Sequence, residues 1–309
     1  MQKKNAQIAN FNVVFGDDER PMLDYFDTVI YPAFTSGISK KSDDVEYLLV
    51  DIQLLINFRN ELYFTGKIVK KTILEVLTDM DEDRILIEKD EKHSSAPYST
   101  FAICLKNHRM LFLPNQKGSP TLRGFKSIIT YILRQYIATK NKDLEERLPE
   151  PIVNVVGIPN SKSLREVLKS VEKVNTLTLK FYPLNGDMDL SGLFPIMSTD
   201  LRRTVGSKTG QIMLNSPKSI EGIVEVLEQA GGTINPIIRA TTKDKAKVTL
   251  KDEQVLEKFE MEFDENVGFS EESEMIVQKT SRIETLAYTN EEHEEIYNRN
   301  VARIIELQK

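Results

Sequence analysis

Cysteine, histidine and tryptophan are nearly absent from this 309-residue sequence, which has one cysteine, three histidines and no tryptophan. With Cys104 as its single cysteine the chain can form no internal disulfide, which is typical of proteins from a reducing compartment. The histidines His93, His108 and His293 have no helical i, i+4 spacing, and no CxxC pair accompanies them. The sequence therefore predicts no metal centre of the zinc type.

Long apolar runs are also missing. The longest candidate, residues 47–56, is interrupted by Asp51 and Gln53 and falls short of the roughly 18 residues that a membrane-spanning helix needs. No apolar segment follows the amino-terminal Met-Gln-Lys-Lys-Asn, so the pattern of a secretory signal is not seen. We expect a soluble, cytoplasmic protein with no membrane partner.

The most informative absence is that of acidic residues from residues 94–142, a stretch that carries eight Lys or Arg. The whole chain has 41 Lys+Arg against 47 Asp+Glu, so the remainder holds 33 basic against 47 acidic residues. A basic segment in an acidic protein is a candidate anion site, because neighbouring charges of one sign concentrate the electrostatic field.

The first half of the chain has the pattern of a mixed α/β fold. Alternation of apolar and polar residues predicts strands over 8–15, 45–57, 62–77 and 84–88, and helical spacing predicts a helix over 21–34. The acid-free stretch then predicts a hairpin, residues 98–105 and 110–114, whose turn uses Asn107 for a positive φ. After the hairpin, Ser119 and Pro120 have the residue types of a helix N-cap and first position, and a helical apolar stripe follows.

A charged connector ending in Pro149-Glu150-Pro151 separates this half from elements predicted in the order β-α-β-β-α-β. The strands are expected over 152–158, 176–182, 211–214 and 234–241, the helices after Ser163 and Ser216, and an inserted helix over 190–205. This order is typical of a ferredoxin-like sandwich.

Residues 252–295 carry 15 acidic residues against three basic ones and lead into an amphipathic helix from Glu291. This tail is a solvated appendage, an internal competitor lying across the basic surface, or the contact for a basic partner. The predicted fold is α+β. An N-terminal mixed-sheet domain ends in a helix (1–148), a ferredoxin-like domain follows (149–251), and the acidic, largely helical tail (252–309) packs on the second domain.

The candidate anion site lies where the acid-free stretch passes from hairpin to helix. A helix N-terminus offers unpaired N–H groups and partial positive charge, and Gly118 would let the backbone approach a phosphate closely. The expected contact residues are Lys106, His108, Arg109, Lys117, Gly118, Ser119, Arg123 and Lys126. The alternative is an ordinary capped helix with a solvated basic face.

A second acid-free segment, residues 201–220, adds Arg202, Arg203 and Lys208 to the candidate surface. Its Gly206-Ser-Lys-Thr-Gly210 has the residue types of a phosphate-binding P-loop but not the spacing. Two basic segments, one in each half of the chain, predict a groove that follows a phosphate backbone. Two unrelated solvated faces are the alternative.

No catalytic motif is recognisable. Cys104 and His108 would lie roughly 13 Å apart on one strand, at about 3.3 Å per residue, which is too far for a nucleophile–base pair. Glu88 and Glu91, in the string Glu-Lys-Asp-Glu-Lys beside a strand, resemble the acidic-x-Lys ending of restriction-type nuclease sites, which would need Mg²⁺. Outside that alternative no cofactor is expected.

Three short strings carry a resemblance: Ala96-Pro-Tyr-Ser-Thr-Phe-Ala-Ile, Asn107-His-Arg-Met-Leu and Asn115-Gln-Lys-Gly-Ser-Pro. They resemble uncharacterised proteins of bacterial mobile elements, some of which occur among phage-defence genes, mainly over residues 1–140. The resemblance implies a bacterial defence setting and supplies no catalytic residues. We expect an anti-phage component that binds nucleic acid. A protein–protein sensor or inhibitor module that engages a phage or host protein, and a metal-dependent nuclease, are the alternatives. Besides nucleic acid, the partners considered are another protein and further copies of the chain in a homo-oligomer.

Overall fold

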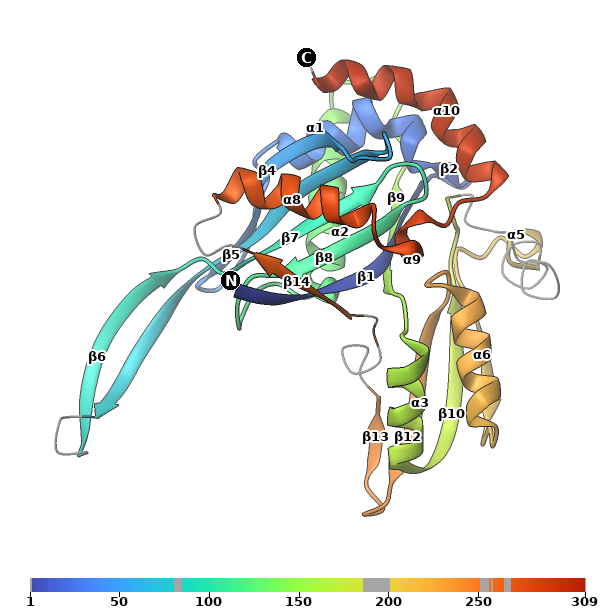
Figure 1. Cartoon of the computed structure of the whole chain (residues 1–309). Helices are drawn as coiled ribbons and strands as arrows, with labels where there is room; N and C mark the ends of the chain where they lie inside the picture. The colour runs from blue at the N-terminus through green and yellow to red at the C-terminus, as the bar shows by residue number, and fades with distance from the viewer. Residues whose placement is uncertain are drawn as a thin grey trace.

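Two β-sheets and the helices that cover them make up the molecule (Figure 1). The structure, a computed structural model, describes residues 2–80, 85–185, 201–250, 256, 258–263 and 268–308. Helices and mainly antiparallel strands are mixed along the chain, so the predicted α+β class is confirmed. None of the helices within those ranges has the length and apolar character to cross a membrane. The domain boundaries stay a prediction.

Ten strands form the large sheet: β1 Gln2–Phe15, β2 Arg20–Pro21, β3 Lys40–Ser42, β4 Val45–Ile56, β5 Leu62–Met80, β6 Leu86–Ser95, β7 Tyr98–Cys104, β8 Arg109–Pro114, β9 Pro151–Gly157 and β14 Lys258–Phe263. The main order is β14-β1-β8-β7-β5-β4-β3. One edge of β1 pairs with β8. Its other edge pairs with β14 along the first half and with β9 along the second. Strand β1 therefore has partners along both of its edges, although it lies near one end of the strand order.

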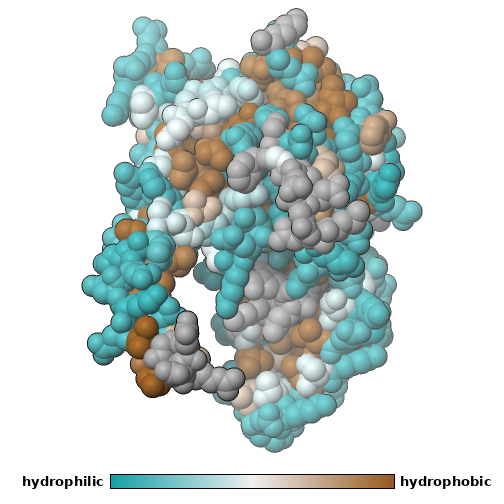
Figure 2. Space-filling view, turned by 60° about the vertical axis from the view of Figure 1, so that its left-hand side comes forward, coloured by the Kyte–Doolittle hydropathy of each residue, from teal (hydrophilic) through white to brown (hydrophobic). Residues whose placement is uncertain are grey.

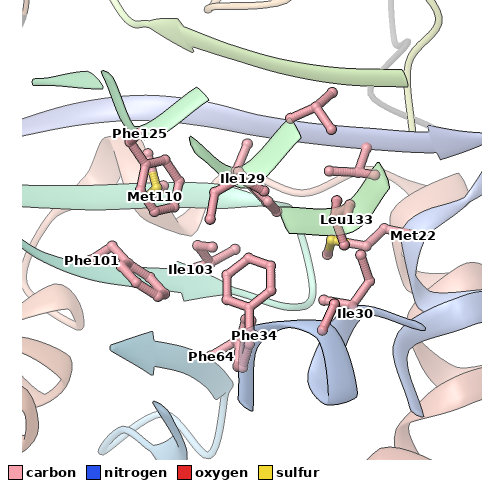
Figure 3. Packing of buried hydrophobic residues seen from close by; sticks show 14 of the residues in the cluster. Met22, Ile30, Phe34, Phe64, Phe101, Ile103, Met110, Phe125, Ile129 and Leu133 are labelled. Carbon is pink, nitrogen blue, oxygen red and sulfur yellow. The ribbon is translucent and has the colours of Figure 1, made fainter. Parts of the chain in front are cut away.

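Side chains that alternate along each strand give the large sheet two buried faces. One face packs against a helical segment, residues 22–35, and against α2 (Leu122–Lys140), and forms the main core (Figure 3). Phe34 of the helical segment lies 4.9 Å from Phe64 of β5, and Phe125 of α2 lies 5.0 Å from Phe101 of β7, between ring centroids. These aromatic contacts join the sheet to helices from two parts of the chain.

The helical segment predicted over 21–34 is confirmed, although its pitch changes along its length. It consists of the 3-10 turn η1 Met22–Tyr25, the π-helical turn η2 Phe26–Ile30 and α1 Tyr31–Thr35.

The acidic tail covers the second face of the large sheet. It forms α8 Phe269–Thr280, α9 Glu284–Ala287, α10 Glu291–Ile305 and the 3-10 turn η4 Glu306–Gln308. Ile276 of α8 and Leu286 of α9 join Tyr63 and Cys104 in one buried cluster, while Ile304 of α10 reaches the main core. The tail therefore packs on the large sheet and not on the second half of the chain as predicted, because its apolar side chains complete a layer there.

The small sheet has the order β11-β10-β12-β13, with all pairs antiparallel. Its elements are β10 Val171–Phe181, β11 Gly210–Asn215, β12 Asn235–Thr242 and β13 Lys247–Thr249, with helices α3 Ser161–Ser170, α5 Leu201–Thr204 and α6 Ile220–Ala230. Helices α3 and α6 bury Leu177 and Leu179 of β10 beneath them. Thr176 and Lys180 lie on the opposite face, away from α3 and α6.

The strand predicted over 152–158 is formed as β9, but it pairs with β1 and not with the small sheet. Its Val153 belongs to the main core, so the long edge of β1 holds it there. The ferredoxin-like order is thus not confirmed. Helix α3 is capped by Asn160, whose side chain accepts the Ser163 N–H at 2.9 Å, and not by Ser163. Most of the helix predicted over 190–205 lies outside the described residues.

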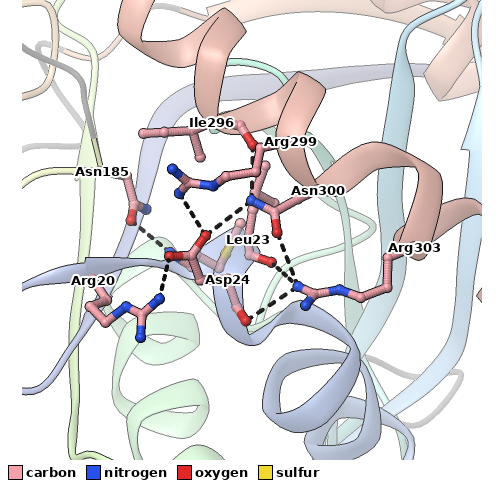
Figure 4. A network of polar contacts seen from close by, with 9 residues as sticks. Arg20, Leu23, Asp24, Asn185, Ile296, Arg299, Asn300 and Arg303 are labelled. Atoms are coloured by element: carbon pink, nitrogen blue, oxygen red, sulfur yellow. Dashed lines mark hydrogen bonds and ion pairs between the residues drawn. The ribbon is translucent and has the colours of Figure 1, made fainter.

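A network around Asp24 ties α10 to the amino-terminal helical segment (Figure 4). The Asp24 carboxylate accepts hydrogen bonds from Arg299 at 2.7 Å, Asn300 at 3.0 Å and Arg20 at 3.4 Å. Arg303 donates to the main-chain oxygen of Asp24 at 3.2 Å. Burial alone would raise the pKa of Asp24, but these hydrogen bonds and the nearby Arg charges hold the pKa below its ordinary value.

We expect Asp24→Asn to lower the free energy of unfolding at pH 7 by about 1–2 kcal/mol, because it removes charge-assisted hydrogen bonds at a partly solvated site. The folded-state pKa lies below the unfolded value near 3.8, so the contribution is complete above that value and is lost as pH falls below it. Urea unfolding at pH 7 and at pH 3 measures both. Asp18→Asn, at an exposed neighbouring position, is the control. Equal unfolding midpoints for the two variants would contradict the expectation.

Candidate anion-binding groove

Helix α2 begins two residues later than the sequence predicts. Thr121 is the N-cap, and its hydroxyl accepts the N–H of Gly124 at 3.2 Å. Ser119 instead donates to Asn115 Oδ1 at 2.6 Å and accepts the N–H of Gln116 at 3.1 Å, which closes the loop before the helix. Ser119 is therefore a loop residue and not the predicted cap, because its hydroxyl is engaged with residues that precede it.

One side of α2 faces the core and the other carries basic residues. Its buried positions include Phe125, Ile129 and Leu133. Arg123, Lys126, Thr130 and Arg134 are spaced three or four residues apart and so share the outer side of the helix. From Arg123 to Arg134 the row spans roughly 16 Å at about 1.5 Å per residue.

This outer side of α2 forms one wall of a groove with a volume of about 1260 Å³. The other wall comes from the small sheet, through Asn235, Pro236 and Ile237 of β12 and the adjoining Thr249 and Leu250. The basic residues of its described lining are Lys40, Arg123, Lys126 and Arg134, and none of the described lining residues is acidic. The groove is therefore an electropositive space between the two sheets.

The open face of the small sheet extends the positive charge. Lys180 is paired with Asn235 in the strand register, so the two side chains lie on the same face of the small sheet. Arg239 lies two positions beyond Ile237 and four beyond Asn235 on β12, so it also points to this face, which lines the groove. The side chains of Lys180 and Arg239 are both exposed. The two walls thus present positive charge toward the same space.

Lys126 is the most embedded cation of the groove. Its ammonium donates to Asn154 Oδ1 of β9 at 2.8 Å, and no ion pair to a described carboxylate accompanies that bond. Burial lowers the pKa of Lys126, and the positive charge of Lys180 lowers it further. A negative ligand in the groove would oppose both effects, because it stabilises the charged ammonium.

The residues predicted in the hairpin turn contact the tail and the small sheet. Lys106 forms an ion pair with Glu294 of α10 at 2.8 Å, and His108 is fully buried with its ring centroid 5.7 Å from that of His293. Arg109 donates to the main-chain oxygen of Gly231. Their role as ligand contacts is thus replaced by contacts with the tail and the small sheet. His108, and not Asn107, has the positive φ of the turn, 57°.

The three candidate residues of the second basic segment form ion pairs within the chain. Arg202 and Arg203 both form ion pairs with Glu19, and Lys208 pairs with Asp17 at 3.3 Å. The predicted single groove lined by both acid-free segments is therefore not what the structure has.

Lys117 and Gly118 lie exposed in the loop before α2 and do not line the groove. Of the eleven predicted contact residues, only Arg123 and Lys126 do. Sequence reasoning missed Lys40 and Arg134 of the lining, and Lys180 and Arg239 on the adjoining face of the small sheet. Arg123, Lys126 and Arg134 have i, i+3, i+11 spacing on one helix, so Arg134 could have been added to the α2 row from the sequence. The positions of Lys180 and Arg239 depend on strand register.

The residues weighed for catalysis lie apart from the groove. Burial raises the pKa of Cys104 to about 11, which suits a packing residue. Glu88 and Glu91 lie on β6, where Glu91 contacts Lys89 at 3.4 Å and His93 at 3.2 Å. Within the described ranges no three His, Cys, Asp or Glu side chains gather in a metal-binding arrangement. The nuclease alternative stays an untested hypothesis.

We expect Lys180→Gln to raise the pKa of Lys126 toward its ordinary value of 10.5, because it removes a neighbouring positive charge that disfavours protonation. Part of the depression should remain, since burial also contributes. An NMR titration of the lysine side-chain signals measures the shift. Lys173→Gln, an exposed position on the same strand, is the control, and equal pKa values for Lys126 in both variants would contradict the coupling.

Comparison with known proteins adds no name to this site. The sequence matches no protein-family model and no curated protein. The resemblance of the amino-terminal half to mobile-element proteins accordingly stays a prediction. The basic lining of the groove is the feature of the structure that indicates a function.

Proposed function

We propose that the protein binds the phosphate backbone of a nucleic acid in the groove between α2 and the small sheet. The observation that carries the proposal is a space of about 1260 Å³ whose described lining has four basic residues and no acidic one. When clustered Lys and Arg side chains neutralise phosphates, counterions bound to the nucleic acid are released. This release is the main source of affinity in such complexes.

The length of the basic row suits a polymer better than a single anion. The roughly 16 Å between Arg123 and Arg134 corresponds to about five phosphates of one strand at a rise of about 3.4 Å. Thr121, Ser127, Thr130 and Gln135 add polar groups along the same wall. Hydroxyl and amide groups of this kind contact phosphate and sugar oxygens without reading bases. The proposed binding is therefore independent of sequence.

The anti-phage role belongs to the same proposal. Its support is the resemblance of the amino-terminal half to proteins of mobile elements, and a sequence-independent nucleic-acid binder fits such a setting. Arg123→Gln/Lys126→Gln should lose protection against phage in a plate assay, whereas the control Lys169→Gln/Lys218→Gln should retain it. This pair of results tests the link between groove and defence.

We expect Arg123→Gln/Lys126→Gln to weaken nucleic-acid binding by about 10- to 100-fold at 0.1 M salt and to reduce the salt slope by about two, since two phosphate contacts are lost. Fluorescence anisotropy with a labelled 20-nucleotide strand and its duplex, at several salt concentrations, measures both quantities and separates the two ligand forms.

The matched control is Lys169→Gln/Lys218→Gln, which removes the same charge from exposed positions that do not line the groove. Its affinity should stay close to that of the unmodified protein. Absence of salt-dependent binding by the unmodified protein at 50 mM salt would refute the proposal, and so would an equal loss in both variants.

A further inference from the structure

A two-stranded arm projects from the large sheet (Figure 1). Strand β5 pairs with β4 and β7 only up to Lys71 and Val69. Beyond that point its described partner is β6, in a register that runs from Thr72–Ser95 to Met80–Leu86. We call residues 72–80 and 85–95 the arm. Figure 2 shows it standing clear, with an open space between it and the part of the molecule that holds the small sheet.

The arm exposes apolar side chains on both of its faces. By strand alternation Ile73, Leu77 and Ile87 lie on one face, and Leu74 and Leu86 lie on the other with Met80. Leu77 is 62% exposed and Leu86 is 71% exposed. No described residue of the arm belongs to any of the three buried clusters. An isolated two-stranded ribbon is only marginally stable in water, so a covering surface would stabilise it.

The charge of the arm indicates what kind of surface covers it. Its described residues include five acidic side chains and two lysines, a net charge of −3. Both lysines already pair within the arm, Lys89 with Asp79 at 2.7 Å and Lys92 with Glu75 at 2.8 Å. A polyanion would be repelled, so the complementary surface is basic and partly apolar.

The groove of a second copy has this character. Its walls combine Arg123, Lys126 and Arg134 with the half-buried apolar residues Val155 and Ile237, and its described lining holds no carboxylate. An acidic ribbon with apolar side chains therefore matches it in sign and in polarity. The nucleic acid proposed above is a second ligand for the same walls.

We propose that the arm of one copy docks in the groove of a second copy. The contact joins two different surfaces, so one copy offers its arm while its own groove stays free for a third. Arm and nucleic acid then compete for the groove, and ligand binding disassembles the oligomer. The association depends on the groove but not on the identity of its other ligand.

Light scattering coupled to size-exclusion chromatography tests the contact. The unmodified protein should at least double its mass as its concentration rises, and should return to a monomer at high salt. The arm variant Leu77→Ser/Leu86→Ser and the groove variant Arg123→Glu/Lys126→Glu should each stay monomeric. An equimolar mixture of the two variants should form a one-to-one dimer, because one supplies an intact groove and the other an intact arm.

The control Phe58→Ser/Leu201→Ser, which removes two exposed apolar side chains elsewhere, should associate like the unmodified protein. A monomer at every concentration overturns the proposal. So does a groove variant that still associates, which would point to contact between arms, and so does a mixture that fails to pair. The arm variant should bind nucleic acid at least as tightly as the unmodified protein. Loss of nucleic-acid binding by every form would sink the proposed function and leave the association test intact.

Discussion

Pairing along both edges of β1 is the constraint on which the remaining structure depends. Antiparallel ladders join this strand to β8 on one side and to β14 and β9 on the other, and its side chains alternate between two cores. Because β9 leads into the small sheet and β14 follows it, the base of the small sheet is fixed against the large one. The groove exists because β9 places the small sheet beside α2, with Asn154 of β9 holding Lys126.

The groove is positive because many basic residues elsewhere in the chain are paired with acceptors of the same chain, whereas those of the groove have few acidic partners. The basic residues that the sequence offers in the hairpin turn and near α5 form ion pairs and hydrogen bonds within the chain, with Glu294, Gly231 and Glu19 as partners. Those of the outer row of α2 have few such partners, and Arg134 reaches Glu150 only at 4.0 Å on the surface. A positive face thus remains where two sheets meet.

Local patterns predicted the hairpin, the apolar stripe of α2 and the start of α10, because each depends on neighbours within a few residues. The partners of Lys106 and Arg203 come from opposite ends of the chain, Glu294 and Glu19, so a charge count along the sequence could not identify them. The sheet to which β9 belongs was predicted wrongly for the same reason, because a strand with alternating residues fits any sheet that has a free edge. Lys180 and Arg239 come to the sheet face beside the groove only through the register of β10 and β12.

The helices that cover the second face of the large sheet are synthesised after most of the strands that form it. Residues that cover the second face of the large sheet, such as Ile276 and Leu286, belong to the tail, while Tyr63 and Cys104 of the face itself lie on strands that precede the tail. A growing chain therefore carries an uncovered apolar face, and a half-vacant edge of β1, until β14 and α8 have been synthesised. Such exposed apolar surface and unpaired strand edges make a nascent chain prone to aggregation.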